Sequence, residues 1–252
     1  MKKLVSIFCA AALALSLAGC GAQAADTNTN TNTTAPVVST VYSLEDATVL
    51  TFTDSGITAQ DGSTGYEIDG TALTIDSAGT YAVTGTCADG SITIKKGTTG
   101  VTLVLNGLSL TSADTAPITC NKSTEVTIIA AEGSVNSLTD SARNNDDEYP
   151  DNEAAENAVI KCKDGSQVTL GGTGSLTITA NGKNGIKSGT TTAEEGEASL
   201  TICELTLTIN APVNDAVNAE QTLNVESGTL TIAAADDALH SDLVLNIGAE
   251  GT

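Results

Sequence analysis

The sequence predicts an all-β fold, a right-handed single-stranded parallel β-helix whose coils have about 22 residues and three short strands each. A strand pattern of alternating Leu, Thr and Ile recurs at 175–178, 206–209 and 229–232, with spacings of 31 and 23 residues. The polar insertion 190–198 accounts for the longer spacing. The composition also favours short strands and tight turns, since the chain has 24 Gly but only 2% aromatic residues.

The first twenty residues have the pattern of a bacterial lipoprotein signal. Lys2 and Lys3 precede an apolar run over residues 4–17, which is too short for a comfortable membrane span. The run ends in Leu-Ala-Gly-Cys, which resembles a lipobox, so we expect cleavage before Cys20 and lipidation of its thiol. An ordinary cleavage site with a chance Cys is the alternative. The sequence therefore predicts an exported protein that is lipid-anchored at the outer face of the cell envelope.

The rest of the chain divides into a linker, an N-terminal region and the regular coils. Residues 21–40 are rich in Asn and Thr and have nothing to bury, as is typical of a linker. Residues 41–100 follow the repeat less regularly, and we expect an N-terminal cap or the first coils there, because a solenoid needs a protected end. Residues 101–252 are expected to form the coils. The chain ends at Thr252 within a repeat, the pattern of a C-terminally truncated solenoid.

The charge of the chain restricts its partners. The sequence has 31 acidic and 10 basic residues, and two of the basic residues lie in the leader. Such a surface repels nucleic acid and anionic lipid and attracts divalent cations. We therefore expect no nucleic-acid partner, and contact with a membrane only through the lipid on Cys20.

One aliphatic position follows the second strand through five coils: Ile118, Ile160, Ile186, Val217 and Leu239. The widest gap, of 42 residues, contains an acidic loop at 141–156. Small residues occur two positions later, where side chains again point inward; they are Cys120, Cys162, Ser188, Ala219 and Ser241. We expect Cys120 and Cys162 to be stacked core thiols. An inter-coil disulfide, which one strand spacing permits, is the alternative.

Acidic and amide side chains gather at one corner of the predicted coils. They precede the aliphatic positions by two or three residues, and comprise Asn184, Asn214, Asp215, Asp236 and Asp237. Carboxylate, amide and backbone oxygens are the ligands that Ca²⁺ prefers, so we predict a calcium site here. A metal-free ladder of hydrogen-bonded Asn and Asp turns is the alternative. The acidic loop either adds ligands or is a solvated insertion; its candidate ligands are Asp146, Asp147 and Asp151.

An outward stripe follows the aliphatic positions by one residue. It contains Thr119, two lysines, an Asn and the only His of the chain. We predict that this stripe binds the carboxylates of an acidic polysaccharide such as polygalacturonate, with calcium bridging sugar and protein; the predicted ligand-binding residues are Lys161, Lys187, Asn218 and His240. Solvated lysines that balance nearby acids are the alternative.

Five short motifs follow one another along the chain: GTYAVTG at 79–85, VTLVLNG at 101–107, EGSVNSLT at 132–139, NGI at 184–186 and DDAL at 236–239. Their order resembles a family of bacterial, often lipid-anchored carbohydrate-binding proteins, formerly a domain of unknown function, over roughly residues 65–248. The resemblance implies a calcium-containing β-helix related in fold to pectate lyases, with cellulose or acidic-sugar binding. The chain departs from the family pattern at Ala238, where Gly is usual, and at 187–189, where Ser-Lys-Asp is usual.

Three functions remain open at this point: a non-catalytic binder of polysaccharide, a calcium-dependent lyase, and a solenoid adhesin or spacer. A calcium-dependent lyase would use Lys187 or Lys161 as the base that removes the sugar C5 proton. A solenoid adhesin or spacer would use the repeat only for length. Asp236 and Asp237 are neighbours that point in opposite directions, so they make a poor hydrolase pair. Scarce aromatic residues disfavour a flat cellulose platform. We therefore expect a non-catalytic binder of polysaccharide.

Overall fold

The computed structural model describes residues 44–248, and their regular secondary structure consists of β-strands alone. The predicted leader, Cys20 and the linker lie outside the described residues. Within the described part of the chain, no helix is long and apolar enough to cross a membrane.

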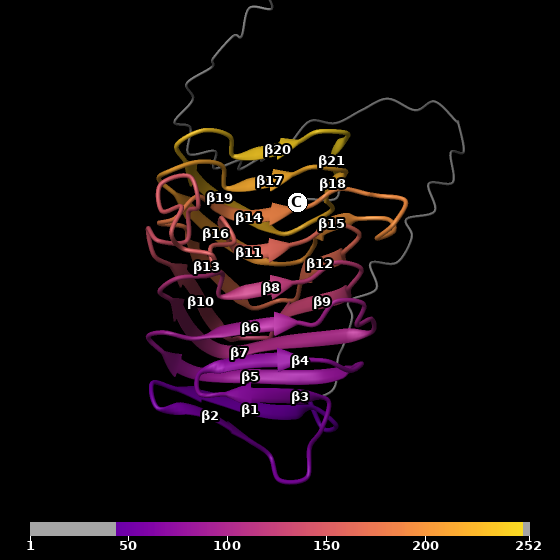
Figure 1. Cartoon of the computed structure of the whole chain (residues 1–252). Helices are drawn as coiled ribbons and strands as arrows, with labels where there is room; N and C mark the ends of the chain where they lie inside the picture. The colour runs from indigo at the N-terminus through magenta and orange to yellow at the C-terminus, as the bar shows by residue number, and fades with distance from the viewer. Residues whose placement is uncertain (1–43, 249–252) are drawn as a thin grey trace, which may run out of the picture. The chain divides into compact units, whose positions relative to one another are not determined.

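Two antiparallel pairs begin the described chain. Strand β1 pairs with β2, and β3 pairs with β4. Each pair then joins the parallel arrangement, because β1 also pairs with β5 and β4 also pairs with β6. The predicted N-terminal region is thus built from hairpins at the first rungs of the stack (Figure 1). These strands are β1 (Thr48–Thr53), β2 (Gly56–Ala59), β3 (Tyr66–Asp69), β4 (Ala72–Ile75), β5 (Gly79–Cys87) and β6 (Ser91–Ile94).

The remaining strands repeat in groups of three. From β7 to β18, each strand pairs in parallel with the strand three places later, as β10 does with β13, β13 with β16 and β16 with β19. They are β7 (Val101–Ser112), β8 (Ile118–Cys120), β9 (Glu125–Ala130), β10 (Val135–Asp140), β11 (Ala158–Cys162), β12 (Gln167–Gly171), β13 (Ser175–Thr179), β14 (Asn184–Ser188), β15 (Ser199–Ile202), β16 (Thr206–Ala211), β17 (Val217–Ala219), β18 (Leu223–Val225), β19 (Thr229–Ala234), β20 (Leu239–Ser241) and β21 (Leu245–Ile247).

The strands form a 13-stranded sheet and an 8-stranded sheet. The long strand β7 pairs with β10 along one part and with β9 along another, so the two flanks of the larger sheet join there. The larger sheet therefore curls around the core, and the 8-stranded sheet, β20-β17-β14-β11-β8-β6-β4-β3, closes the open side (Figure 1). The predicted all-β architecture of parallel strands is confirmed. The right-handed winding of a single-stranded β-helix stays a prediction.

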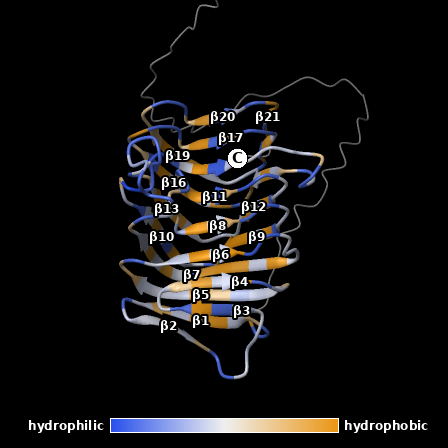
Figure 2. Cartoon of the chain, in the orientation of Figure 1, coloured by the Kyte–Doolittle hydropathy of each residue, from blue (hydrophilic) through white to orange (hydrophobic). Residues whose placement is uncertain are grey.

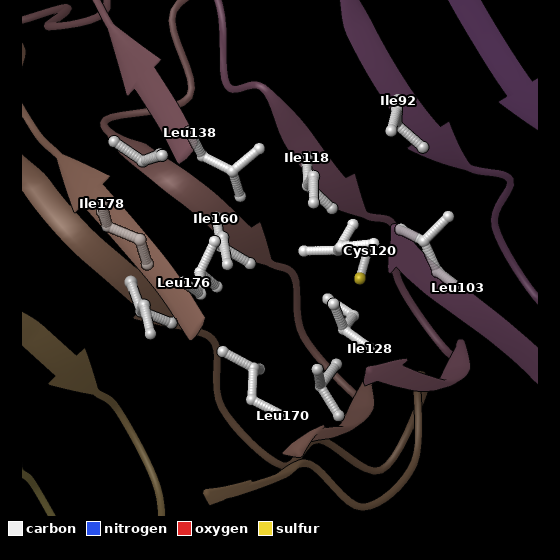
Figure 3. Close-up of a cluster of buried hydrophobic side chains, with 14 of the residues drawn as sticks. Ile92, Leu103, Ile118, Cys120, Ile128, Leu138, Ile160, Leu170, Leu176 and Ile178 are labelled. Atoms are coloured by element: carbon white, nitrogen blue, oxygen red, sulfur yellow. The ribbon is translucent and has the colours of Figure 1, made fainter. Parts of the chain in front are cut away.

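The predicted columns are confirmed residue by residue in the 8-stranded sheet. Ile118 pairs with Ile160, Ile160 with Ile186, Ile186 with Val217, and Val217 with Leu239. Four of these side chains are fully buried, and the core that they enter contains aliphatic residues from all three strands of each coil (Figure 3). In Figure 2 the hydrophobic residues follow the strands, whereas the corners between strands are largely hydrophilic.

The cysteines that follow the aliphatic column are free thiols in the structure. Cys120 and Cys162 are partners in register on β8 and β11, and both are fully buried. Figure 3 shows Cys120 among Ile118, Ile128 and Leu103. The structure thus has the stacked thiols that were expected.

The acidic loop between β10 and β11 is fixed by its own hydrogen bonds. Asn144 donates from Nδ2 to the Asp140 carboxylate at 2.8 Å and to the Ala158 carbonyl at 2.9 Å. Asn152 donates to the carbonyls of Asp114 and Arg143 at 2.6 and 2.7 Å. These amide groups are buried in the loop. These hydrogen bonds tie the loop to β10 and β11, although its carboxylates at 146–148 and 151 are exposed.

The insertion between β14 and β15 folds back across earlier coils. Its Glu195 carboxylate accepts hydrogen bonds from Lys96 at 2.8 Å and from the Ser123 hydroxyl at 2.9 Å. Gly165 lies beneath it, and a Cβ at Gly165 would come within 2.1 Å of the Glu195 carbonyl oxygen. The insertion and the acidic loop together border the strands of the 8-stranded sheet at their two ends.

Candidate functional site

The outward stripe is a continuous row on the 8-stranded sheet. Lys161 on β11 pairs with Lys187 on β14, Lys187 with Asn218 on β17, and Asn218 with His240 on β20. Adjacent strands lie about 4.8 Å apart, so the four side chains leave the sheet at successive rungs. All four are half-buried. The structure therefore brings together every residue of the predicted ligand-binding set.

Two members of the stripe, Lys187 and Asn218, contact acidic residues on or beside β17. Lys187 forms an ion pair with Glu220 at 3.2 Å. Asn218 donates from Nδ2 to the Asp215 carboxylate at 2.6 Å. Each of these contacts links the stripe to residues on or beside β17, so the row is held in place by the acids that surround it.

His240 lies between two carboxylates. Its Nε2 is 2.9 Å from Asp242 Oδ1, and its Nδ1 is 3.3 Å from Asp237 Oδ2. The hydrogen bond with Asp242, and after it the one with Asp237, raises the pKa of His240 above its ordinary value. The imidazole is thus biased toward the charged form in which both nitrogens donate.

Lys161 differs from its neighbours in the stripe. Among the described residues, no carboxylate lies within 4.0 Å of its ammonium group, whereas Lys187 and the nearby Lys163 each have a glutamate partner. Burial of its side chain, and after that the charge of Lys187, lowers the pKa of Lys161. The stripe therefore contains one cation whose charge is not balanced by a direct contact.

Three carboxylates of the predicted metal site do converge. One ligand oxygen from each of Asp215, Asp236 and Asp237 can be chosen so that all lie within 4.8 Å of one another. Asp215 is buried in the turn two residues before β17, and the backbone N–H of Asp237 donates to its Oδ1 at 3.0 Å. Stacking of the turns before β17 and β20 is what joins them. We name this group the acidic corner.

The donor set of the acidic corner suits calcium. Ca²⁺ binds oxygen ligands at about 2.3 to 2.6 Å, so two ligands of one ion lie at most about 5 Å apart, as these carboxylate oxygens do. Each carboxylate has about four lone-pair positions, so the hydrogen bonds to Asp215 leave it able to bind a cation. The three residues could therefore hold one calcium ion, together with further oxygens from ligand or solvent.

The two predicted amide ligands are engaged with each other. Asn214 donates from Nδ2 to Asn184 Oδ1 at 2.8 Å, and Asn184 donates from Nδ2 to the Asn157 carbonyl at 2.9 Å. These two contacts form a short ladder of hydrogen-bonded Asn side chains between successive turns. It runs from the acidic loop toward the acidic corner and supports the turns that carry Asp215 and Asp236.

The acids of the loop have other partners. Asp147 forms an ion pair with Lys183, and Asp151 lies 3.7 Å from Arg143. The backbone N–H of Asp146 donates to Asn157 Oδ1. Within residues 44–248, these carboxylates are not part of the acidic corner.

Two acids beside the stripe, Glu220 and Asp242, were missed by the sequence analysis. Each lies two residues after a member of the stripe, Asn218 and His240 respectively. Successive residues of a strand alternate between faces, so a position two residues later returns to the outward face. Extending the column alignment by two residues was the signal that could have identified them.

Comparisons with known proteins bear on this site. Residues 69–246 match a family described as "Carbohydrate-binding domain-containing protein". No curated protein matches the chain significantly. A solved structure titled "Structure of the polysaccharide lyase-like protein from C. thermocellum, Gadolinium derivative" is similar, with a TM-score of 0.52, 22% sequence identity, and coverage of 82% of this chain and 99% of that chain. At this identity the likeness shows a shared fold.

Proposed function

The chain belongs to the family of carbohydrate-binding domain-containing proteins, and from that premise we propose that it binds a polysaccharide along the outward stripe, beside the acidic corner. The observation that carries the proposal is the in-register row from Lys161 to His240 on β11, β14, β17 and β20. A row with one side chain per rung offers polar contacts to successive units of a polymer. The right-handed winding of the β-helix belongs to the same proposal.

The polysaccharide that suits this stripe is acidic, such as polygalacturonate. The described chain has few cations, and two of its lysines lie side by side in the stripe. Carboxylates on a sugar chain would interact with those ammonium groups. Cellulose is the neutral candidate, although the scarcity of aromatic residues gives it little to stack on.

Calcium is the cation that we propose for the acidic corner. Asp215, Asp236 and Asp237 would hold the ion, whose charge would offset the repulsion between them. Bound there, calcium would supply free coordination positions for a sugar carboxylate. Asn218 and His240 contact Asp215 and Asp237 directly, so the ion and the stripe would act on one stretch of polymer.

The place of binding is proposed to be the cell exterior. The leader and Cys20 support export and lipid anchoring, and the Asn- and Thr-rich segment supplies a tether. A tethered binder of this kind would hold the cell to polysaccharide or hold polysaccharide at the cell.

A calcium-dependent lyase is the second candidate, because of one observation. The lowered pKa of Lys161 increases the fraction of neutral amine that could accept the sugar C5 proton. Lyase action would leave unsaturated sugar ends, which absorb ultraviolet light.

One experiment separates these functions. The full chain is incubated with polygalacturonate or cellulose, with calcium or with EDTA, and both co-sedimentation and ultraviolet absorbance are followed. We expect saturable, EDTA-sensitive co-sedimentation with polygalacturonate and constant absorbance. Rising absorbance would show lyase activity and overturn the proposal of a non-catalytic binder. The absence of co-sedimentation under all conditions would overturn carbohydrate binding through this stripe.

A further inference from the structure

The cations of the described chain are almost all paired, and this makes Lys161 an exception. The six Lys and Arg residues with a carboxylate within 4.0 Å are Lys96, Lys122, Arg143, Lys163, Lys183 and Lys187. Lys95 has no such partner among the described residues but is exposed, so water solvates it. Lys161 also has none, although it is half-buried in a chain with a large excess of acids.

The two glutamates near Lys161 are engaged elsewhere. Glu156 pairs with Lys163 at 2.6 Å, and Glu220 pairs with Lys187 at 3.2 Å. On the sheet, Lys161 lies between Thr119, which is 5% exposed, and Lys187. Two ammonium groups on neighbouring strands repel each other, and burial weakens the solvation that would offset this repulsion. The place beside Lys161 therefore favours a negative group that the described chain does not supply.

We propose that Lys161 is the direct receptor, without a metal ion, for one anionic group of the bound polysaccharide, with Lys187 beside it as a second donor. This inference rests on the proposed function and names the class of ligand, a polysaccharide that carries carboxylate or sulfate groups. An ammonium group that has no carboxylate partner has all three N–H donors available for this contact, and its charge is not already offset by a neighbouring acid.

The position of Lys161 also gives the direction of the polymer. The acidic corner belongs to the turns before β17 and β20, which are two and three strands away from β11 on the same sheet. At about 4.8 Å per strand, the two sites are roughly 10 to 14 Å apart. A polymer that touches both must run along the stacking direction of the strands, across Lys187 and Asn218. It would therefore have two anchors, one that depends on calcium and one that does not.

The test measures affinity in EDTA, where only the direct contact remains. Full-length chains with Lys161→Gln and Lys95→Gln are compared with wild type, since both substitutions remove one positive charge. The ligands are polygalacturonate, its fully methyl-esterified form, dextran sulfate and dextran. We expect Lys161→Gln to weaken binding of a charged polymer by roughly tenfold or more, and Lys95→Gln to change it less than about twofold. Lys161→Arg should retain most of the affinity.

The ligand series distinguishes the sources of the anion. Loss confined to polygalacturonate assigns a carboxylate, and loss confined to dextran sulfate assigns a sulfate ester; either result supports the inference. Equal effects of Lys161→Gln and Lys95→Gln would overturn it, while wild-type binding in calcium would leave the proposed function intact. An equal loss for the methyl-esterified polymer would also overturn it, since that polymer has no charge to contact. If wild type binds none of the polymers, even with calcium, the proposed function and this inference both fall.

Discussion

Cys120 and Cys162 lie directly opposite each other on the neighbouring strands β8 and β11, and both are fully buried. A hydrogen bond between the two thiols, and after it burial, raises the pKa of Cys120 well above its ordinary value. Because both side chains are fully buried and the reagent needs access to the sulfur, we expect iodoacetamide to leave both residues unlabelled in the native protein and to label both in denaturant. Peptide mass spectrometry measures the labelling of each residue.

Cys203 provides the internal control for this prediction. It is only half-buried, so it should be labelled in the native protein before Cys120 and Cys162, although burial raises the pKa of its thiol as well. A peptide that contains Cys120 linked to Cys162 without reductant would show the inter-coil disulfide instead and would contradict free stacked thiols.

Side chains of the aliphatic column should contribute less to the free energy of unfolding toward the last described coil. Ile186 is fully buried between β11 and β17, whereas Leu239, two rungs further along the column on β20, is only half-buried. We expect Ile186→Ala to lower the free energy of unfolding by about 2 to 5 kcal/mol and Leu239→Ala by less than about 2 kcal/mol. Urea denaturation followed by circular dichroism measures both. Equal losses would mean that the last coil is covered in solution.

The Glu195 contact should make stability depend on pH in the acid range. Hydrogen bonds from Lys96 and then from Ser123 lower the pKa of the Glu195 carboxyl. A carboxyl with a lower pKa in the folded state stabilises the protein above its unfolded pKa, near 4.3, and this contribution is lost as pH falls through the folded pKa. Glu195→Gln should therefore lower the melting temperature at pH 7, by less than about 4 °C because the lysines are largely exposed, and this difference should shrink as the pH falls through the folded pKa.

Glu197→Gln is the matched control, since Glu197 is an exposed acid on the same insertion. It should leave the melting temperature unchanged from pH 3 to pH 7. If Glu195→Gln and Glu197→Gln gave the same profile, the contact of Glu195 with Lys96 and Ser123 would contribute nothing in solution.

The sequence determined the register of the 8-stranded sheet because parallel coils place the same repeat position on each strand. Once Ile160 was aligned with Ile186, the positions of Lys161 and Lys187 followed without further information. The same periodicity brought Asp215 and Asp237 into contact across successive turns. What repeats every coil could therefore be predicted.

The partners of these side chains could not be predicted in the same way. The pairing of Glu156 with Lys163 depends on how the acidic loop enters β11, and the loop occurs only once in the chain. The contact between Glu195 and Lys96 joins residues 99 positions apart through an insertion that has no counterpart in other coils. Periodicity carries no information about such features. For this reason the isolation of Lys161 emerged only from the structure.

Calcium binding at the acidic corner can be tested through Asp236, because no hydrogen bond to its carboxylate is found in the described chain and its loss should leave the fold intact. Ligand charge sets the calcium affinity of such sites, so we expect Asp236→Asn to weaken calcium binding at least about tenfold by isothermal titration calorimetry without sugar. Asp69→Asn removes the same charge from exposed strand β3 and should leave the affinity unchanged. Calcium bound to the acidic corner would stabilise the folded chain, so it should also raise the melting temperature of wild type and of Asp69→Asn more than that of Asp236→Asn. Equal calcium responses in all three proteins would show that calcium binds elsewhere than the acidic corner. No response in wild type would overturn the proposed calcium site.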